Sequence, residues 1–406
     1  MARGGDAVVL TERGVVLAPM ALPGERVELG PARKVSGALR AEVRAVLEPS
    51  SHRVSPACPL AGRCGGCPWM IATLEHQREM KRELLRSALP KGSHHELAPL
   101  IGEPSGLGYR RRARLLFVDG RLGYRARAGA EVVDVEACPV LRPALGRLLE
   151  RARPTLLAEL RGRAELRLYL GLEGRGALAL SAERDQPPSL YAALEGLATQ
   201  PDIAGVSLRI GEARPAIWGD PRERMPGADG VELLGTTGGF SQANDAIAIA
   251  LARALMAAAA PRGGKALELY AGHGTFSILL ARASALRIVE QDPEAIQAAR
   301  ENLRARELEA EICEGDALEQ LGRGSLELAI LDPPRGGARG LLAPLAARRP
   351  KRIVYVSCDT ATLRRDLGEL AGLGYGVRFA QPFDMFPQTA RLESLVVLEP
   401  DRALSG

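Results

Sequence analysis

Residues 266–276, with the sequence ALELYAGHGTF, decide the fold of this 406-residue chain. An apolar run ends at Tyr270, Gly272 and Gly274 follow, and the chain then becomes helical. Glycine at these two positions lets the backbone pass close to a ligand where a Cβ atom would collide. The stretch therefore predicts a strand, a tight turn and a helix, the unit that binds nucleotides in doubly wound α/β sheets.

Further apolar runs alternate with helical segments after this unit, at 286–290, 326–331, 352–356 and 395–398. They predict a largely parallel sheet that is covered on both faces. Polar side chains follow the carboxyl ends of its strands, namely Glu290, Asp316 and Asp332. Glu290 is suited to accept hydrogen bonds from ribose hydroxyls, and Asp316 could bind an adenine amino group. The first loop has no Lys or Arg to neutralise a pyrophosphate, which favours S-adenosylmethionine over a dinucleotide.

Cys358 directly follows another buried run, in VYVSCDT (354–360). We expect it at the same edge of the sheet, near the N-terminus of the next helix, which should lower its pKa. The alternative interpretation is a small core residue. Cys313 lies near another strand end, but no other candidate catalytic residue accompanies it. We interpret Cys313 as a small core residue.

A thiolate at this edge suits the methylation of carbon 5 of uracil. That carbon is too weak a nucleophile unaided, but thiolate addition to carbon 6 makes an enolate that can attack a sulfonium methyl group. A base must then remove the carbon-5 proton. Glu393, just before the last apolar run, is a candidate for that base; otherwise it is a surface acid paired with Arg391.

The first third of the chain is basic and rich in short β runs. Residues 1–150 carry a net charge of +7 and the remainder about −2, which suggests a polyanion partner. Short strands with Pro and Gly turns over residues 1–48 suggest a small barrel of the oligonucleotide-binding sort. The densest basic run could contact phosphates, although a solvated strand edge is an equal alternative. It contains Arg110, Arg111, Arg112 and Arg114.

Three of the six cysteines lie within ten residues, at Cys58, Cys64 and Cys67. No apolar stretch is long enough to span a bilayer, and no secretory signal follows the first residues, so we expect a cytoplasmic protein without a membrane partner. Structural disulfides are uncommon there, which makes metal or cluster ligation the better interpretation of the three cysteines.

Several motifs together resemble the RNA uridine-C5 methyltransferase family, specifically its iron–sulfur-containing branch of 23S rRNA 5-methyluridine enzymes. They are ALPGE (21–25), CGGC (64–67), FSQAN (240–244), DPPR (332–335), SC with ATLRRDL (357–367) and MFPQT (385–389) leading to Glu393. The resemblance extends over nearly the whole chain. It departs at Asp359, where relatives usually have Asn, and at Gln388, where His is frequent.

The resemblance implies three parts. These are a TRAM-like RNA-binding β-barrel (1–48), a central α+β domain with a cysteine cluster (49–235), and a Rossmann-like class I methyltransferase domain (236–406). It implies Cys358 as nucleophile and Glu393 as base. The implied cofactor-binding residues are Gln242, Tyr270, Gly272, Gly274, Thr275, Glu290, Asp316 and Asp332.

Cys138 matches the family's distant fourth cluster ligand. Four cysteines fit either a [4Fe-4S] cluster or zinc, and their spacing does not separate the two; the resemblance favours the cluster. We expect a monomeric enzyme that forms 5-methyluridine, most simply in 23S rRNA.

Three alternatives stay open beside this interpretation. The first is the same chemistry on tRNA. The second is a cytosine-C5 methyltransferase, which would favour a Pro-Cys nucleophile and another motif order. The third is a non-catalytic RNA-binding protein with a degenerate fold, against which the intact Cys358 and Glu393 argue.

Overall fold

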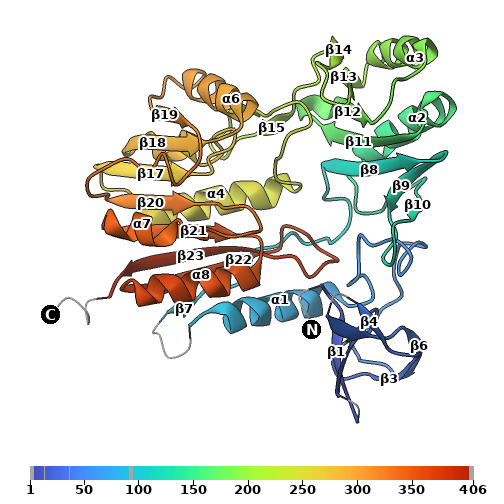
Figure 1. Ribbon diagram of the computed structural model, residues 1–406, viewed down its shortest axis with the longest axis horizontal. Helices are drawn as coiled ribbons and strands as arrows, with labels where there is room; N and C mark the ends of the chain where they lie inside the picture. The colour runs from blue at the N-terminus through green and yellow to red at the C-terminus, as the bar shows by residue number, and fades with distance from the viewer. Residues whose placement is uncertain (1–3, 13, 36, 91–94, 402–406) are drawn as a thin grey trace.

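The structure, a computed structural model, describes residues 4–12, 14–35, 37–90 and 95–401. A lobe built on a large mixed sheet lies beside a second lobe with its own sheet, and a small β-rich region lies next to the second lobe (Figure 1). The predicted first and last domains also include residues 1–3, 13, 36 and 402–406, which lie outside the described residues. Within the described ranges, no helix has the length and apolar character that a bilayer span requires.

The larger lobe contains an eight-stranded sheet in the order β19-β18-β17-β20-β21-β23-β22-β7. The strands β19 to β21 are parallel, whereas β23 runs antiparallel to both of its neighbours. The prediction of a largely parallel sheet is therefore confirmed, with an antiparallel hairpin added at one side. The strands are β17 (Lys265–Leu269), β18 (Ala285–Glu290), β19 (Glu311–Glu314), β20 (Leu328–Leu331), β21 (Arg352–Ser357), β22 (Tyr375–Phe383), β23 (Glu393–Pro400) and β7 (Glu96–Leu97).

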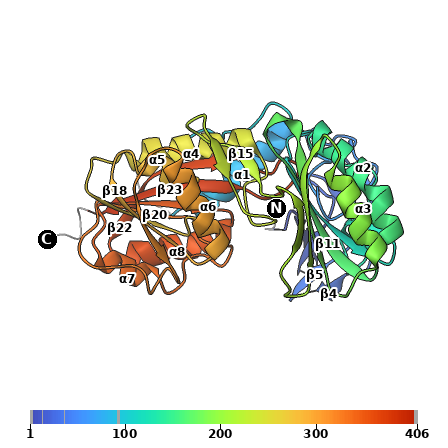
Figure 2. The same ribbon diagram turned by 90° about the horizontal axis from the view of Figure 1, so that it is seen from above.

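Helices cover both faces of this sheet (Figure 2). One face packs against α4 (Asp245–Ala259), α5 (Ser277–Leu280) and α6 (Pro293–Arg304). The opposite face packs against α7 (Leu342–Ala347), α8 (Thr360–Gly372) and α1 (Leu74–Ala88). The helix α1 and the strand β7 thus join the larger lobe, although their residues fall in the range predicted for the central domain.

The second lobe has a seven-stranded sheet in the order β10-β9-β8-β11-β12-β13-β14. The helices α2 (Pro143–Glu159) and α3 (Pro188–Ala198) cover one of its faces, and the other faces the larger lobe (Figure 2). Its strands are β8 (Arg112–Val118), β9 (Arg121–Arg125), β10 (Val132–Asp134), β11 (Arg163–Leu170), β12 (Gly176–Ala182), β13 (Ile203–Ile210) and β14 (Ala216–Gly219), with a 3₁₀ turn at Leu172–Gly174.

The N-terminal region is β-rich, as predicted, and forms two small sheets, β1-β2-β5-β4 and β3-β6. Its strands are β1 (Ala7–Thr11), β2 (Gly14–Ala18), β3 (Arg26–Leu29), β4 (Arg33–Val35), β5 (Ala38–Arg40) and β6 (Val43–Glu48). The strands β4 and β5 were not expected, because three residues are too few to show a period of two.

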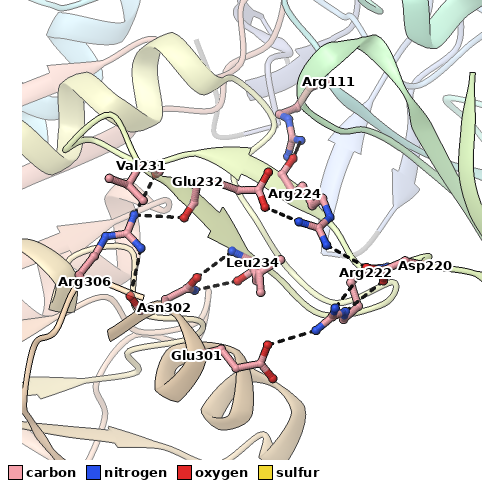
Figure 3. Close-up of polar contacts among 10 residues, drawn as sticks. All are labelled: Arg111, Asp220, Arg222, Arg224, Val231, Glu232, Leu234, Glu301, Asn302 and Arg306. Carbon is pink, nitrogen blue, oxygen red and sulfur yellow. Dashed lines mark hydrogen bonds and ion pairs between the residues drawn. The ribbon is translucent and has the colours of Figure 1, made fainter. Parts of the chain in front are cut away.

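A polar linker fastens the two lobes together (Figure 3). It includes β15 (Arg224–Pro226) and β16 (Glu232–Leu234). Arg306 of the larger lobe donates to the carbonyls of Val231 and Glu232, and Asn302 exchanges two hydrogen bonds of 2.8 Å with the backbone of Leu234. Asn302 also donates to the carbonyl of His273, in the glycine loop. The same buried amide therefore holds both the linker and the predicted cofactor loop.

Candidate active site

The pairing of β21 with β23 brings Cys358 and Glu393 together. In this antiparallel register Ser357 pairs with Ser394, so the next position along β21 faces the residue just before Ser394. Cys358 and Glu393 occupy those two positions, and both line one cavity of about 500 Å³. The ends of two neighbouring strands thus supply a thiol and a carboxyl to the same space.

This cavity lies at the carboxyl edge of the sheet, where open α/β folds bind ligands. It brings together eight of the residues singled out in the sequence: Gln242, Tyr270, Gly272, Thr275, Glu290, Asp332, Cys358 and Glu393. Gly274 and Asp316 do not line it. Gly274 instead packs close to Ala299 with a φ of +89°, so its role is to bring the turn against α6. Asp316 is exposed and caps its own turn by accepting from the amide of Leu318.

The glycine loop holds Glu290 in a fixed orientation. One oxygen of this carboxylate accepts from the amide of Gly272 at 2.8 Å, and the other accepts from the amides of Gln291 and Asp292. His273 is buried beside Thr275, and burial lowers the pKa of its imidazole to about 4. A neutral imidazole therefore packs at the loop, which leaves the cavity without a positive charge from this turn.

Carboxyl groups crowd the catalytic end of the cavity. Burial raises the pKa of Asp332 to about 7, and burial together with the charge of Asp332 raises the pKa of Glu393 well above its usual value, while Arg335 lowers it. Glu268, which the sequence did not single out, is buried below them, and its pKa is raised to about 8. The signal that could have revealed it is a single acidic residue inside the apolar run 266–270.

The expected activation of Cys358 by a helix N-terminus is wrong. Burial, followed by the charges of Glu393 and Asp332, raises the pKa of its thiol to about 12. The first amides of α8 are already occupied, because the Asp359 carboxylate accepts from Ala361 and Thr362 at 2.9 and 3.0 Å. Asp359 is thus the N-cap of the helix, a position that Asn and Asp fill equally well.

The residues that follow the nucleophile hold the neighbouring loop. The buried Asp366 carboxylate accepts from the Tyr355 hydroxyl at 2.6 Å and from the Ala338 amide at 2.9 Å. Arg365 donates to the carbonyl of Gly336. These contacts fix the loop after Asp332, which carries Arg335 into the cavity.

Two cavity atoms are ready to bind a ligand. Gln242 Oε1 and Glu393 Oε2 are buried and have no hydrogen-bond partner among the residues that the structure describes. Because buried polar atoms are almost always bonded, partners from outside the chain are expected. The cavity therefore fits a polar cofactor and a polar substrate.

The four predicted cluster cysteines lie near one another, with Cys138 in the second lobe and the other three in the segment after the N-terminal sheets. Cys58, Cys67 and Cys138 pack against Met70, Tyr109 and Val140. Burial raises the pKa of the Cys67 thiol to about 12, and the charges of Cys138 and Cys64 contribute to the shift. However, no group of three or more His, Cys, Asp or Glu side chains in the described ranges is arranged to hold a metal ion.

The expected RNA contacts of Arg111 and Arg112 are wrong. Arg111 is buried and forms an ion pair with Glu223. It also donates to the carbonyl of Arg224 (Figure 3). Arg112 donates to the carbonyls of Ser241 and Gly239. Arg110 stands over the Phe386 ring at 6.0 Å, and only Arg114 is well exposed, paired with Glu165. Arg112 and Arg114 lie on the same face of β8, but residues 239–241 cover Arg112 and leave Arg114 exposed, which the run of arginines alone does not reveal.

The strand order and the cavity at the carboxyl edge define a class I methyltransferase. The profile described as "Methyltransferase small domain" matches residues 230–341, and the profile described as "tRNA (Uracil-5-)-methyltransferase" matches residues 317–401.

Full-length relatives identify the family. The chain is 34% identical to a 23S rRNA (uracil(1939)-C(5))-methyltransferase of Chromohalobacter salexigens, over 99% of this chain and 88% of the relative. It is 32% identical to an uncharacterised RNA methyltransferase of Streptomyces coelicolor, over 98% and 91%. The fold is similar to that of a Pyrococcus abyssi tRNA (uracil-54, C5)-methyltransferase, with a TM-score of 0.78, 23% identity and 97% of each chain covered. The chain belongs to the RNA uracil-C5 methyltransferase family.

The pKa of Cys358 gives a first prediction. We expect its alkylation by iodoacetamide to accelerate about tenfold per pH unit from pH ~7 to ~10, because a thiol with a pKa of about 12 gains thiolate throughout that range. Glu393→Gln should accelerate the reaction toward the alkaline end of that range, where Glu393 is ionised, since it removes a negative charge there. Mass spectrometry of the peptide that contains Cys358 measures the rate, and Cys313→Ser is the control. A plateau below pH ~8 would contradict the raised pKa.

Proposed function

We propose that this enzyme transfers a methyl group from S-adenosylmethionine to carbon 5 of a uridine in 23S rRNA, with Cys358 as nucleophile and Glu393 as base. The observation that carries the proposal is the register that sets Cys358 opposite Glu393 at one cavity. Similar full-length relatives are named as enzymes of uracil 1939 in 23S rRNA. We therefore favour the corresponding uridine over a tRNA site, to which the more distant structure's name points.

The cofactor would lie along the glycine loop. Gly272 allows the backbone to pass close to it, the Glu290 carboxylate would accept from the ribose hydroxyls, and Gln242 offers a buried oxygen. When bound, S-adenosylmethionine supplies an electrophilic methyl group. The exposed Asp316 stays at the rim as a candidate for the adenine amino group.

The reaction at the uridine begins and ends at Cys358. The thiol releases its proton to solvent as the sulfur bonds to carbon 6, and the electrons of the C5=C6 bond move onto the O4 carbonyl as an enolate, which makes carbon 5 nucleophilic. After methylation, Glu393 accepts the carbon-5 proton. The C–H electrons reform the C5=C6 bond, and the C6–S bond breaks with its electrons on sulfur. Both carbons must leave the base stack to reach the thiol, so an unpaired or flipped uridine is required.

The crowded carboxyls suit this order of events. A raised pKa favours the protonated form of Glu393, which reduces repulsion against a forming thiolate. Once the sulfur has become a neutral thioether in the adduct, that negative charge is gone. The carboxyl can then ionise more readily and act as the base in the last step.

RNA would approach along a basic groove between the N-terminal sheets and the second lobe. The groove has a volume of about 1160 Å³, and its arginines come from both sides. They are Arg33, Arg40 and Arg44 from the N-terminal region and Arg114, Arg125 and Arg127 from the second lobe. Asp6 and Glu42 offset part of this charge, yet the balance is positive and suits a phosphate backbone. This groove, which includes Arg114, and the TRAM-like domain assignment of residues 1–48 take the place of Arg110, Arg111 and Arg112 in our candidate RNA surface.

Cys58, Cys64, Cys67 and Cys138 would hold a [4Fe-4S] cluster with a structural role. The four thiols approach one another, as the mutual effects on their pKa values indicate, but they are not arranged for one ion. Four cysteine thiolates fit either a cluster or a zinc ion, and the family resemblance favours the cluster. When bound, the cluster would cross-link the segment after the N-terminal sheets to the second lobe.

Substitution of the two catalytic residues tests the chemistry. We expect Cys358→Ala to abolish methyl transfer from labelled cofactor to unmodified 23S rRNA, and Glu393→Gln to trap a covalent protein–RNA adduct. Cys313→Ser should retain activity. Residual activity of Cys358→Ala would exclude the covalent route, and methylation of tRNA but not 23S rRNA would exclude the proposed substrate.

Substitution of groove arginines tests the RNA path. Arg33→Ala with Arg125→Ala should weaken RNA binding and reduce the slope of log K against log salt by roughly 0.7 for each lost phosphate contact. Cofactor affinity should not change. Arg304→Ala, an exposed arginine on α6, is the control. An unchanged salt slope in the double variant would place the RNA elsewhere.

Elemental analysis tests the cluster. Anaerobically purified protein should contain about four irons and four sulfides per chain and show a broad visible absorption. Cys138→Ser should lower the iron content, whereas Cys313→Ser should not. One zinc per chain without iron would contradict the proposal.

A further inference from the structure

A single loop delivers the proposed base to the cavity. Residues 384–392, here called the base loop, connect β22 to β23 and end immediately before Glu393. Phe386 and Arg391 of the same loop also line the cavity. The conformation of the base loop therefore determines both the position of the carboxyl group and the shape of the cavity wall.

The backbone of the base loop is bonded to residues about 300 positions earlier in the chain. Three consecutive carbonyls are involved. Lys81 Nζ donates to Phe386 at 2.9 Å, the Tyr109 hydroxyl donates to Pro387 at 3.3 Å, and the Trp69 amide donates to Gln388 at 2.9 Å. Each of three successive carbonyls of the loop thus accepts a hydrogen bond from α1 or from the segments before and after it.

Gln77 of α1 is the centre of these contacts. It is fully buried, accepts from the Gln388 amide at 2.8 Å and donates to Gln388 Oε1 at 2.9 Å. Its two Nε2 hydrogens are shared among Gln388 Oε1 and the carbonyls of Trp69 and Ala72. The Gln388 side chain in turn donates to the carbonyl of Gly106 at 3.3 Å. Every polar atom of the Gln77 amide is used, so no apolar residue of equal size could replace it without leaving buried groups unpaired.

Gln388 needs such support because its backbone is strained. Its φ is +68°, in the left-handed region that residues other than Gly, Asn and Asp rarely occupy. The reciprocal contact with Gln77 bonds both the backbone amide and the side chain of this residue. The loop keeps an unfavourable turn because α1 specifies it.

A buried ion pair fixes the other end of the loop. Lys81 and Asp384, the first loop residue, are both fully buried and bonded to each other. The Asp384 amide also donates to the carbonyl of Ile101 at 2.7 Å. The loop is therefore anchored at residue 384 and again at residues 386–388, five residues before the base.

We propose that Gln77 is a positioning residue for proton removal: through Gln388 it holds the base loop so that the Glu393 carboxyl reaches carbon 5 of the methylated adduct. This inference rests on the proposed function. Gln77 touches no reacting atom and acts only through the loop. Its loss should slow the step in which Glu393 takes the carbon-5 proton and the C6–S bond breaks, and should affect the earlier addition of sulfur less.

The test compares Gln77→Met with a matched control, Gln186→Met. Gln186 is also a buried glutamine with three hydrogen bonds to backbone, but it lies in the second lobe, away from the cavity. We expect both variants to lose similar thermal stability. Only Gln77→Met should accumulate the covalent adduct on a denaturing gel and lower turnover on the order of tenfold, as for a displaced catalytic group. Tyr109→Phe, which removes one loop contact alone, should shift both readouts in the same direction if Gln77→Met does not fold.

Glu393→Gln separates the inference from the function on which it rests. If Glu393→Gln accumulates the adduct while Gln77→Met and Tyr109→Phe behave like Gln186→Met, the positioning role is overturned and the proposed function stands. If Glu393→Gln accumulates none, the base assignment is wrong and the positioning role falls with it. Combining Gln77→Met with Gln388→Met should give less than the sum of the two single effects, because both act through one contact.

Discussion

The antiparallel pairing of β21 with β23 is the constraint on which the site depends. A parallel strand in the place of β23 would carry its own carboxyl end to this edge, and no residue before it could face Cys358. Reversing one strand brings the start of β23 to the end of β21, so that Glu393 lies opposite the thiol. The doubly wound part of the sheet binds the cofactor, and the added hairpin supplies the base.

Burial then determines the charges of the site. Burial raises the pKa of Asp332, Glu393 and Cys358 at the cavity and of Glu268 in β17, and the charge of Asp332 adds to the shifts of the other three. In a low dielectric such groups hold protons that they would lose in water. The carboxyl and thiol groups of the site therefore hold their protons close to the uridine. The reaction must first release a proton there and later accept one. A helix N-terminus aimed at the thiol would have activated it permanently, and Asp359 prevents that by capping α8.

The parts predictable from sequence were those with local signals. The glycine turn, the alternating apolar runs and the acids at strand ends indicated the sheet and most of the cavity, because strand order brings such ends to one edge. The inward side chains of Arg111 and Arg112 could not be read, since a charged run gives no sign of which face is buried. The raised pKa of Cys358 could not be predicted from the sequence either, because it depends on burial and on Glu393 and Asp332, which are distant from Cys358 along the chain.

The departure at Gln388 shows how an unusual residue becomes understandable only in three dimensions. In the sequence it was a substitution within a motif, without any partner. In the structure its backbone amide and its side-chain oxygen are both bonded to Gln77, 311 positions away. Contacts of such sequence separation form only after the chain has closed a large loop, so they are expected late in folding. The base loop would then reach its strained turn only when α1 docks against α8, which makes the assembled site a consequence of the complete chain.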